Sequence, residues 1–234
     1  MKITIPVQKF DLNKQIGEIN DLNQKCLELK NECQYRSDDT RNMIFTLFNL
    51  EIQFLLLSTT LSKNLTDVNF YKQNNYKVDN IDENYLETSI YQYISSLSNS
   101  YFILMYVQLE NYLRLIALHK NIHHININQI VGNFQNTFGL SDDNMNLLKI
   151  IFNLRNSMHN GGYHTHKDAA IHYKDRQFIF EQGKPIFLGE IGIVFFTFLT
   201  SEILTSLIVE INKNTGGEEF IEHNYAKLDF EVQE

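Results

Sequence analysis

Apolar residues recur at helical spacing along most of the chain. The stretches with this pattern are residues 16–36, 43–61, 83–120, 129–138, 142–160 and 189–212. Asp38, Asp39 and Thr40 are candidate caps ahead of the second stretch, and its broad apolar arc predicts a central helix. The third stretch contains no Gly or Pro, so we expect it to form the longest helix.

Two short segments ahead of the last helical stretch have the composition of strands. Residues 170–173 and 177–180 are rich in apolar and aromatic side chains, and the polar residues 174–176 separate them. A short polar break between two such segments is typical of a tight turn. The pattern therefore predicts a β-hairpin near residues 169–182.

Three other segments lack helical periodicity. Residues 62–82 are rich in Asn, Lys, Asp and Tyr and predict a long surface connection, while residues 3–10 alternate enough for a short strand. The acidic stretch from about residue 214 predicts a loose tail. The whole pattern predicts a mainly α fold, a helical bundle with a small inserted β-hairpin, in a single domain over residues 1–234.

The composition narrows the range of partners. The chain has 234 residues, of which 43% are hydrophobic, so it can bury a sizeable core. Its 20 Lys and Arg stand against 28 Asp and Glu, and the net charge of -8 excludes a broad basic face for nucleic acid. Any contact with RNA or DNA must therefore be local.

The sequence indicates a cytoplasmic protein without a membrane span. Residues 1–6 lack the apolar stretch and small-residue cleavage site of a secretory signal. Residues 191–209 are long enough for a membrane helix, but Glu202 lies inside them and Glu190 and Glu210 flank them. These charges favour a buried core helix.

The two cysteines agree with a reducing compartment. Cys26 and Cys33 are seven residues apart on one face of a predicted helix, where they cannot bridge each other. We therefore expect core or interface thiols.

The helix predicted at residues 142–160 carries the candidate chemistry. On a helical wheel Arg155 projects within the apolar arc, and His159, one turn later, points about 40° away, so we expect the two side chains to share the inward face. A buried guanidinium without a partner is costly, so Arg155 requires a carboxylate, backbone carbonyls, a facing subunit or an anionic ligand. In a purely structural alternative, Arg155 pairs with a buried acid such as Glu110 and His159 binds a carbonyl near the helix end.

The sequence from Leu154 to Gly162, Leu-Arg-Asn-Ser-Met-His-Asn-Gly-Gly, resembles the signature of the HEPN superfamily (higher eukaryotes and prokaryotes nucleotide-binding), small helical-bundle proteins often found as dimers. In its ribonuclease members an Arg, commonly followed by Asn, precedes a His by four to six residues. Arg155 and Asn156 match this start, and His159 is the closest match to the His, with only three residues between it and Arg155. An Arg-Asn-x-x-His-Asn-x-Gly motif followed by a hairpin and a final helix is similar to one branch of the superfamily.

The resemblance implies a metal-independent endoribonuclease of toxin or defence type that leaves a cyclic phosphate. In that reaction Arg155 would stabilise the phosphate, His159 would act as acid or base, and Asn156 would orient them. A homodimer would bring two copies of the single His together, and a cognate inhibitor protein is a further expected partner. No cofactor is implied. The side chains expected to contact the RNA substrate are Asn160, Tyr163, His164, Glu110 and Arg114.

Two other interpretations remain open at this point. The shortened spacing and the acidic charge favour a non-catalytic HEPN-like module that binds nucleotide, RNA or protein. A structural or interaction protein is the third class, with the tyrosines of residues 85–112 in a packing interface, although aromatic residues at helical spacing are usually core. A metal site is not expected, because the His groups at 159–166 and 119–124 lack an acidic ligand at a familiar spacing, and His164 and His166 are expected in a solvated loop.

Overall fold

A computed structural model of the chain describes residues 11–74, 83–122, 126–186, 192–217 and 219–224. This part is mainly helical and holds one two-stranded antiparallel sheet, which confirms the predicted fold class. The strand predicted at residues 3–10 lies outside the described residues.

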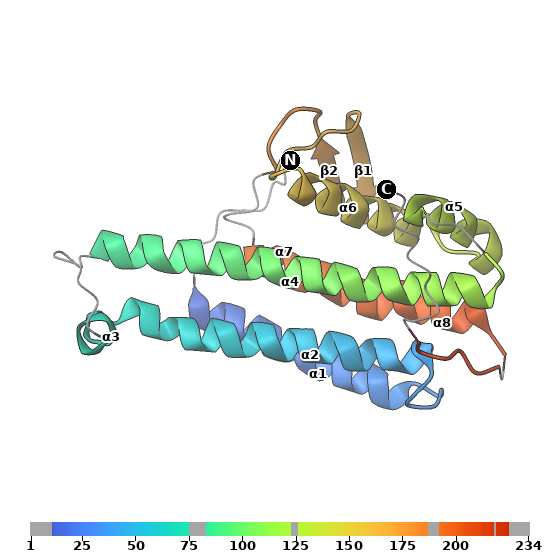
Figure 1. Cartoon of the computed structure of the whole chain (residues 1–234), viewed down its shortest axis with the longest axis horizontal. Coiled ribbons are helices and arrows are strands. Elements are labelled where there is room, and N and C mark those ends of the chain that lie inside the picture. The colour runs from blue at the N-terminus through green and yellow to red at the C-terminus, as the bar shows by residue number, and fades with distance from the viewer. Residues whose placement is uncertain (1–10, 75–82, 123–125, 187–191, 218, 225–234) are drawn as a thin grey trace.

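Four helical segments form a bundle around the main core. They are α1 (Leu12–Glu32), α2 (Thr40–Leu61), α4 (Glu83–His119) and the last helical stretch at residues 192–215. In Figure 1 α1 and α2 run below α4 and α7, and α1 packs on α2, α2 on α4, α4 on α7 and α7 on α1. Buried tyrosines of α4 join it to the last stretch, since Tyr101 donates to Thr200 Oγ1 at 3.0 Å and Tyr112 to Asn212 Oδ1 at 2.7 Å. Part of the tyrosine-rich stretch is thus core.

The last helical stretch is divided into three segments. These are α7 (Gly192–Glu202), a π-helical segment (Ile203–Ile208) and α8 (Val209–Thr215). It therefore extends beyond the predicted end at residue 212, and its predicted start at residue 189 lies outside the described residues. A Cβ at Gly192 would lie 2.7 Å from Ser98 Oγ, so α7 approaches α4 closely at that point.

The predicted hairpin is present and lies on the outside of α6 (Asp142–His159). Its strands β1 (Ala169–Tyr173) and β2 (Arg176–Phe180) pair with Ile171 opposite Phe178, and β1 packs on α6. Ser141 caps α6 by accepting from the Asn144 N–H. Gly161 and Gly162 follow α6 with φ of 67° and 90°, a left-handed backbone that favours glycine.

The connection predicted at residues 62–82 contains helix. A 3-10 segment (Ser62–Thr66) leads to α3 (Val68–Gln73), which Asp67 caps. The prediction of a loop is therefore wrong for residues 62–73 of this connection. Tyr71 of α3 is buried and meets the Tyr85 ring edge to face at 5.8 Å. This anchor holds α3 against the start of α4.

The predicted short helix forms as α5 (Ile127–Phe138). Asn126 caps it by accepting from the Asn128 N–H at 2.8 Å, and Gly139 ends it with a left-handed φ of 59°. Because α5 packs on α4, α6 and α8, its first turn lies between α4 and α6.

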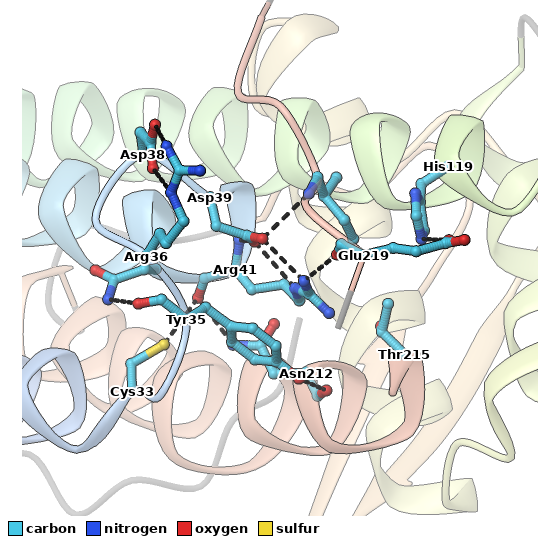
Figure 2. A network of polar contacts seen from close by, with 12 residues as sticks. Cys33, Tyr35, Arg36, Asp38, Asp39, Arg41, His119, Asn212, Thr215 and Glu219 are labelled. Atoms are coloured by element: carbon cyan, nitrogen blue, oxygen red, sulfur yellow. Dashed lines mark hydrogen bonds and ion pairs between the residues drawn. The ribbon is translucent and has the colours of Figure 1, made fainter. Parts of the chain in front are cut away.

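Residues 219–224 are bound to the bundle, although the sequence predicts a loose tail from about residue 214. Residues 219–224, the C-terminal strap, run across the start of α2, where the Ile221 N–H donates to Asp39 Oδ2 at 3.1 Å and the Ile221 carbonyl accepts from Thr40 at 2.8 Å. Arg41 Nη2 donates to the Glu219 carbonyl at 2.6 Å. Figure 2 shows this network. For residues 219–224 the prediction is wrong, because their partners lie about 180 positions away in sequence and leave no local pattern; residues 225–234 lie outside the described residues.

An apolar face remains outside the bundle on α2 and α4. Large apolar side chains that are at least 38% exposed lie along it, namely Leu50, Phe54, Leu57, Leu61, Leu104 and Val107. Two stretches, Thr40–Thr66 and Gly192–Thr215, are long and apolar enough to cross a membrane by composition, and 39% and 61% of their most apolar windows are buried. The second therefore has the burial of a core helix, whereas α2 contributes one side of an open apolar surface.

Candidate functional site

Arg155 lines a small cavity between α4, α6 and the first turn of α5. The cavity has a volume of about 260 Å³. Its lining residues are Tyr106, Glu110, Arg114, Asn126, Ile127, Asn128, Phe152, Arg155 and Asn156. The structure therefore brings four of the candidate site residues together, two from α4 and two from α6.

The surroundings of Arg155 differ from the structural alternative. Its guanidinium lies 5.4 Å from the centre of the Tyr106 ring, and Nη1 donates to Asn156 Oδ1 at 3.2 Å. Glu110 pairs with Arg114 instead, with Arg114 Nη2 at 2.6 Å and Nε at 3.0 Å from Glu110 Oε1. Among the residues that the structure describes, no carboxylate forms an ion pair with the half-buried Arg155. The predicted pairing with Glu110 is wrong.

The cavity is locally positive in an acidic protein. Two guanidiniums and one carboxylate line it, and the first turn of α5 adds the positive end of a helix dipole. Burial raises the pKa of the Tyr106 phenol, and Glu110 raises it further, so this hydroxyl keeps its proton at neutral pH. Such a cavity suits an anion with several oxygen acceptors.

Asn156 connects the Arg155 cavity to the imidazole of His166. Its amide Oδ1 accepts from Arg155, and its Nδ2 lies 3.4 Å from His166 Nε2. His166 is exposed in the loop after α6, where the sequence predicted it. His159 is exposed at the last position of α6 and does not line the cavity, so the expectation that it shares the inward face with Arg155 is wrong.

The other candidates after α6 have mainly structural surroundings. His164 is 1% exposed, its Nδ1 lies 3.3 Å from Ser157 Oγ and its Nε2 donates to the Lys167 carbonyl at 3.1 Å. The expectation that His164 is solvated and contacts substrate is therefore wrong, because the loop folds back onto the hairpin. Asn160 donates to the Asn156 carbonyl at 2.8 Å and to Thr165 Oγ1 at 2.9 Å.

Tyr163 lies at the surface, away from the cavity lining. Its side chain is 52% exposed, and its backbone forms an isolated bridge with Pro185. This position leaves the side chain accessible to a large ligand but not to one confined to the cavity.

Sequence reasoning missed the contribution of α5. Asn126 and Asn128 line the cavity, and the cap position of Asn126 ahead of an apolar stretch is the one signal that could have placed a helix N-terminus there. Tyr106 and Phe152 form the aromatic wall, edge to face at 6.0 Å, and only their helical spacing is visible in the sequence.

Neither metal binding nor similarity to a known protein narrows the function of this site. Within the described residues no group of three or more His, Cys, Asp or Glu side chains is arranged to hold a metal ion. Comparison of the chain with models of known families, with curated proteins and with solved structures gives no match.

Proposed function

We propose that the cavity at Arg155 binds an RNA phosphate and that the chain is a metal-independent endoribonuclease of toxin or defence type, acting in the cytoplasm. One observation carries the proposal. Arg155 turns inward from α6 into a cavity, yet its charge is left without a carboxylate among the described residues. A phosphate would supply the missing negative charge with a geometry that a guanidinium matches.

The proposed reaction needs a stabilised phosphorane and two proton transfers. A base removes the proton of the 2′-hydroxyl, whose oxygen attacks the adjacent phosphorus, and the bond to the 5′-oxygen breaks as an acid protonates that oxygen. The products are a 2′,3′-cyclic phosphate and a 5′-hydroxyl. Arg155 stabilises the charge on the phosphorane, Asn156 orients Arg155, and the exposed His159 serves as acid or base.

The second proton transfer has two candidate groups. His166 is joined to Asn156 within the same chain, and a homodimer would supply a second His159. The apolar face on α2 and α4 supports the dimer, because Leu50, Phe54 and Leu57 follow one side of α2 and expose 46–60% of their surface.

The charge pattern of this face favours a second copy as its partner. Glu51 is the only charged residue between positions 42 and 61, and Gln108 of α4 donates to it at 3.3 Å. Two chains that each carry a net charge of -8 repel, so contact through an almost uncharged apolar surface minimises the repulsion.

Assembly is tested by sedimentation at several concentrations. Leu57→Glu should convert the dimer to a monomer, because it places a charge in the apolar contact, while the control Gln177→Glu on the exposed hairpin should not. A wild-type monomer at all concentrations would remove the dimer from the proposal.

The function is tested by cleavage of a mixed RNA pool in EDTA. Arg155→Ala and His159→Ala should each abolish cleavage, and the product ends should carry cyclic phosphate. Arg176→Ala and His172→Ala, on the exposed hairpin, are the matched controls and should cleave like wild type. His166→Ala separates the candidates for the second proton transfer, since a loss equal to that of His159→Ala assigns it to this chain. Cleavage that persists in Arg155→Ala would contradict the proposal.

A non-catalytic RNA- or nucleotide-binding module is the second candidate. It is favoured by the position of His159 outside the cavity lining. In that case wild type gives no cleavage, but labelled RNA binds and Arg155→Ala weakens the binding.

A further inference from the structure

A second and larger cavity lies at one end of the four-helix bundle. It has a volume of about 820 Å³, within the range of sites for small organic ligands. Its walls come from the end of α1, the start of α2, α8 and the segment that leads into the C-terminal strap. It shares no lining residue with the Arg155 cavity.

Two arginine and aromatic pairs form part of the wall, and Figure 2 shows the polar network behind them. The Arg41 guanidinium lies 3.6 Å from the centre of the Tyr35 ring, and the Arg36 guanidinium lies 4.7 Å from the centre of the Phe220 ring. Each arginine uses Nε and Nη2 for a neighbouring aspartate, so the guanidinium planes are fixed. The guanidiniums orient the Tyr35 and Phe220 rings, which therefore present flat apolar surfaces to a ligand with little loss of side-chain entropy on binding.

The two guanidiniums keep hydrogen-bonding capacity. Arg41 is 1% exposed, and its Nη1 has no hydrogen-bond partner among the described residues. Arg36 bonds Asp38 through Nε and Nη2 at 3.0 Å and 2.7 Å, so its Nη1 is not engaged by that carboxylate. A buried donor without an acceptor is unusual in a folded protein.

The donors on the wall favour a ligand with a negative group. Asp39 is neutralised by Arg41, and Glu32 is the other acidic residue of the lining. Lys213 lines the cavity and forms no ion pair with a described carboxylate. Arg36 and Arg41 are each paired with an aspartate, so Lys213 is the cation of the lining that keeps its charge free of a described carboxylate.

The apolar part of the lining requires more than a simple anion. Leu29, Phe45 and Val209 lie in the wall together with the two aromatic rings. The first N–H groups of α2 are already bonded, since Thr40 donates to the Ile221 carbonyl and Arg41 to Asp39 Oδ1. An inorganic anion therefore cannot bind the N-terminus of α2, and it would leave the apolar part of the lining exposed to water.

We propose that this cavity binds a small organic anion with a planar apolar body, the body against Tyr35 and Phe220 and the negative group at Arg36 and Lys213. This site goes beyond the proposed nuclease function and does not depend on it. The strap forms one wall through Phe220, so an occupied site would also hold residues 219–224 in place.

Cys33 provides a reporter inside the cavity. Its half-buried thiol lines the wall and donates to the Arg41 carbonyl at 3.6 Å. Cys26, the only other cysteine, is fully buried, and burial raises its pKa to about 12. Alkylation of the folded chain should therefore report Cys33, with Cys26 as the internal control.

The experiment measures iodoacetamide alkylation of Cys33 by mass spectrometry with three probes. They are 8-anilinonaphthalene-1-sulfonate, the uncharged N-phenyl-1-naphthylamine and inorganic sulfate. The sulfonate should slow alkylation at least tenfold at saturation, the uncharged probe should bind about tenfold more weakly, and sulfate alone should not protect.

Two pairs of variants locate the binding. Val209→Trp fills the cavity and should abolish high-affinity binding of the sulfonate in a fluorescence titration, while Val194→Trp, at an equally exposed valine of α7 outside the lining, should not. Lys213→Gln should weaken binding about tenfold and the exposed Lys149→Gln should not. Unchanged alkylation of Cys33 at saturation, equal affinity in the two tryptophan variants, or equal protection by the uncharged probe would overturn the proposal.

Discussion

Arg41 and Arg155 are two inward arginines of one protein with opposite surroundings. Arg41 is 1% exposed and binds Asp39 through two hydrogen bonds of 2.9 Å and 2.8 Å. Arg155 is half-buried, and the side chain of its sequence neighbour Asn156 accepts its hydrogen bond. Both lie against a tyrosine ring, at 3.6 Å for Arg41 and 5.4 Å for Arg155.

The difference distinguishes Arg41, whose charge is neutralised within the protein, from Arg155, whose charge suits a ligand. The charges of Asp39 and Arg41 neutralise each other within the protein, and the pair fastens the C-terminal strap. Arg155 keeps its charge uncompensated by any described carboxylate and faces a cavity that suits a phosphate. Changes at the first should therefore alter stability, and changes at the second should alter function.

Removing Arg41 should have the largest effect. Arg41→Met leaves Asp39 buried without its counter-ion and releases the Glu219 carbonyl, so we expect the free energy of unfolding to fall by about 3–5 kcal/mol. Arg155→Met, the matched substitution, should change it by less than about 1 kcal/mol because no ion pair is lost. Urea unfolding followed by circular dichroism measures both. Equal losses in the two variants would show that the two arginines do not differ in the proposed way.

Arg155→Lys should have a functional effect of the next size. Lysine keeps the charge but loses the planar fork that matches phosphate oxygens, so we expect the initial rate of RNA cleavage to fall about 100-fold. The measurement is cleavage of a fluorescent RNA in EDTA with unchanged urea unfolding. The same substitution at the exposed Arg176 is the control, and a wild-type rate in Arg155→Lys would show that only charge is needed there.

The buried pair also predicts a dependence of stability on pH. Burial raises the pKa of Asp39, but the hydrogen bonds from Arg41 and Ile221 outweigh it and hold the pKa below its usual range. The unfolded chain then takes up the proton first, so the contribution of Asp39 is present above about pH 4 and is lost as the pH falls through its lowered pKa.

Asp39→Asn tests this dependence by urea unfolding at a series of acidic pH values. The variant should be less stable at neutral pH and should lose less stability than wild type on acidification. Asp175→Asn in the hairpin turn keeps the pair and is the control. A variant that loses as much stability as wild type below pH 4 would contradict the assignment.

The helices and the hairpin could be predicted because their signals are local. Asp39 caps α2, Ser141 caps α6, and Gly161 follows α6 with the left-handed backbone expected of it. The strap could not be predicted in this way, because its contacts join residues 39–41 to residues 219–222 across the length of the chain. Periodicity reports which face of a segment is buried but not which distant segment covers it.

The same limit applies to the candidate site. The wheel placed Arg155 on the inner face of α6, and the cavity contains it together with the predicted Glu110 and Arg114. The wheel could not tell that Glu110 pairs with Arg114 one turn away, or that the loop turns His164 inward onto the hairpin. Pairing and loop direction depend on side-chain reach and on backbone turns, which a residue spacing does not contain.

The smallest effect should come from the exposed counterpart of the Arg41 pair. Arg36 binds Asp38 with the same two guanidinium nitrogens, at 3.0 Å and 2.7 Å, but the two side chains are 71% and 54% exposed. Water and salt screen such a pair, so Arg36→Gln should change the free energy of unfolding by no more than about 0.5 kcal/mol. Urea unfolding of Arg36→Gln and Arg41→Met then compares the same pair of guanidinium hydrogen bonds in an exposed and in a buried ion pair. A loss for Arg36→Gln that approaches the loss for Arg41→Met would mean that the stacking of Arg36 on Phe220, rather than burial, holds the strap.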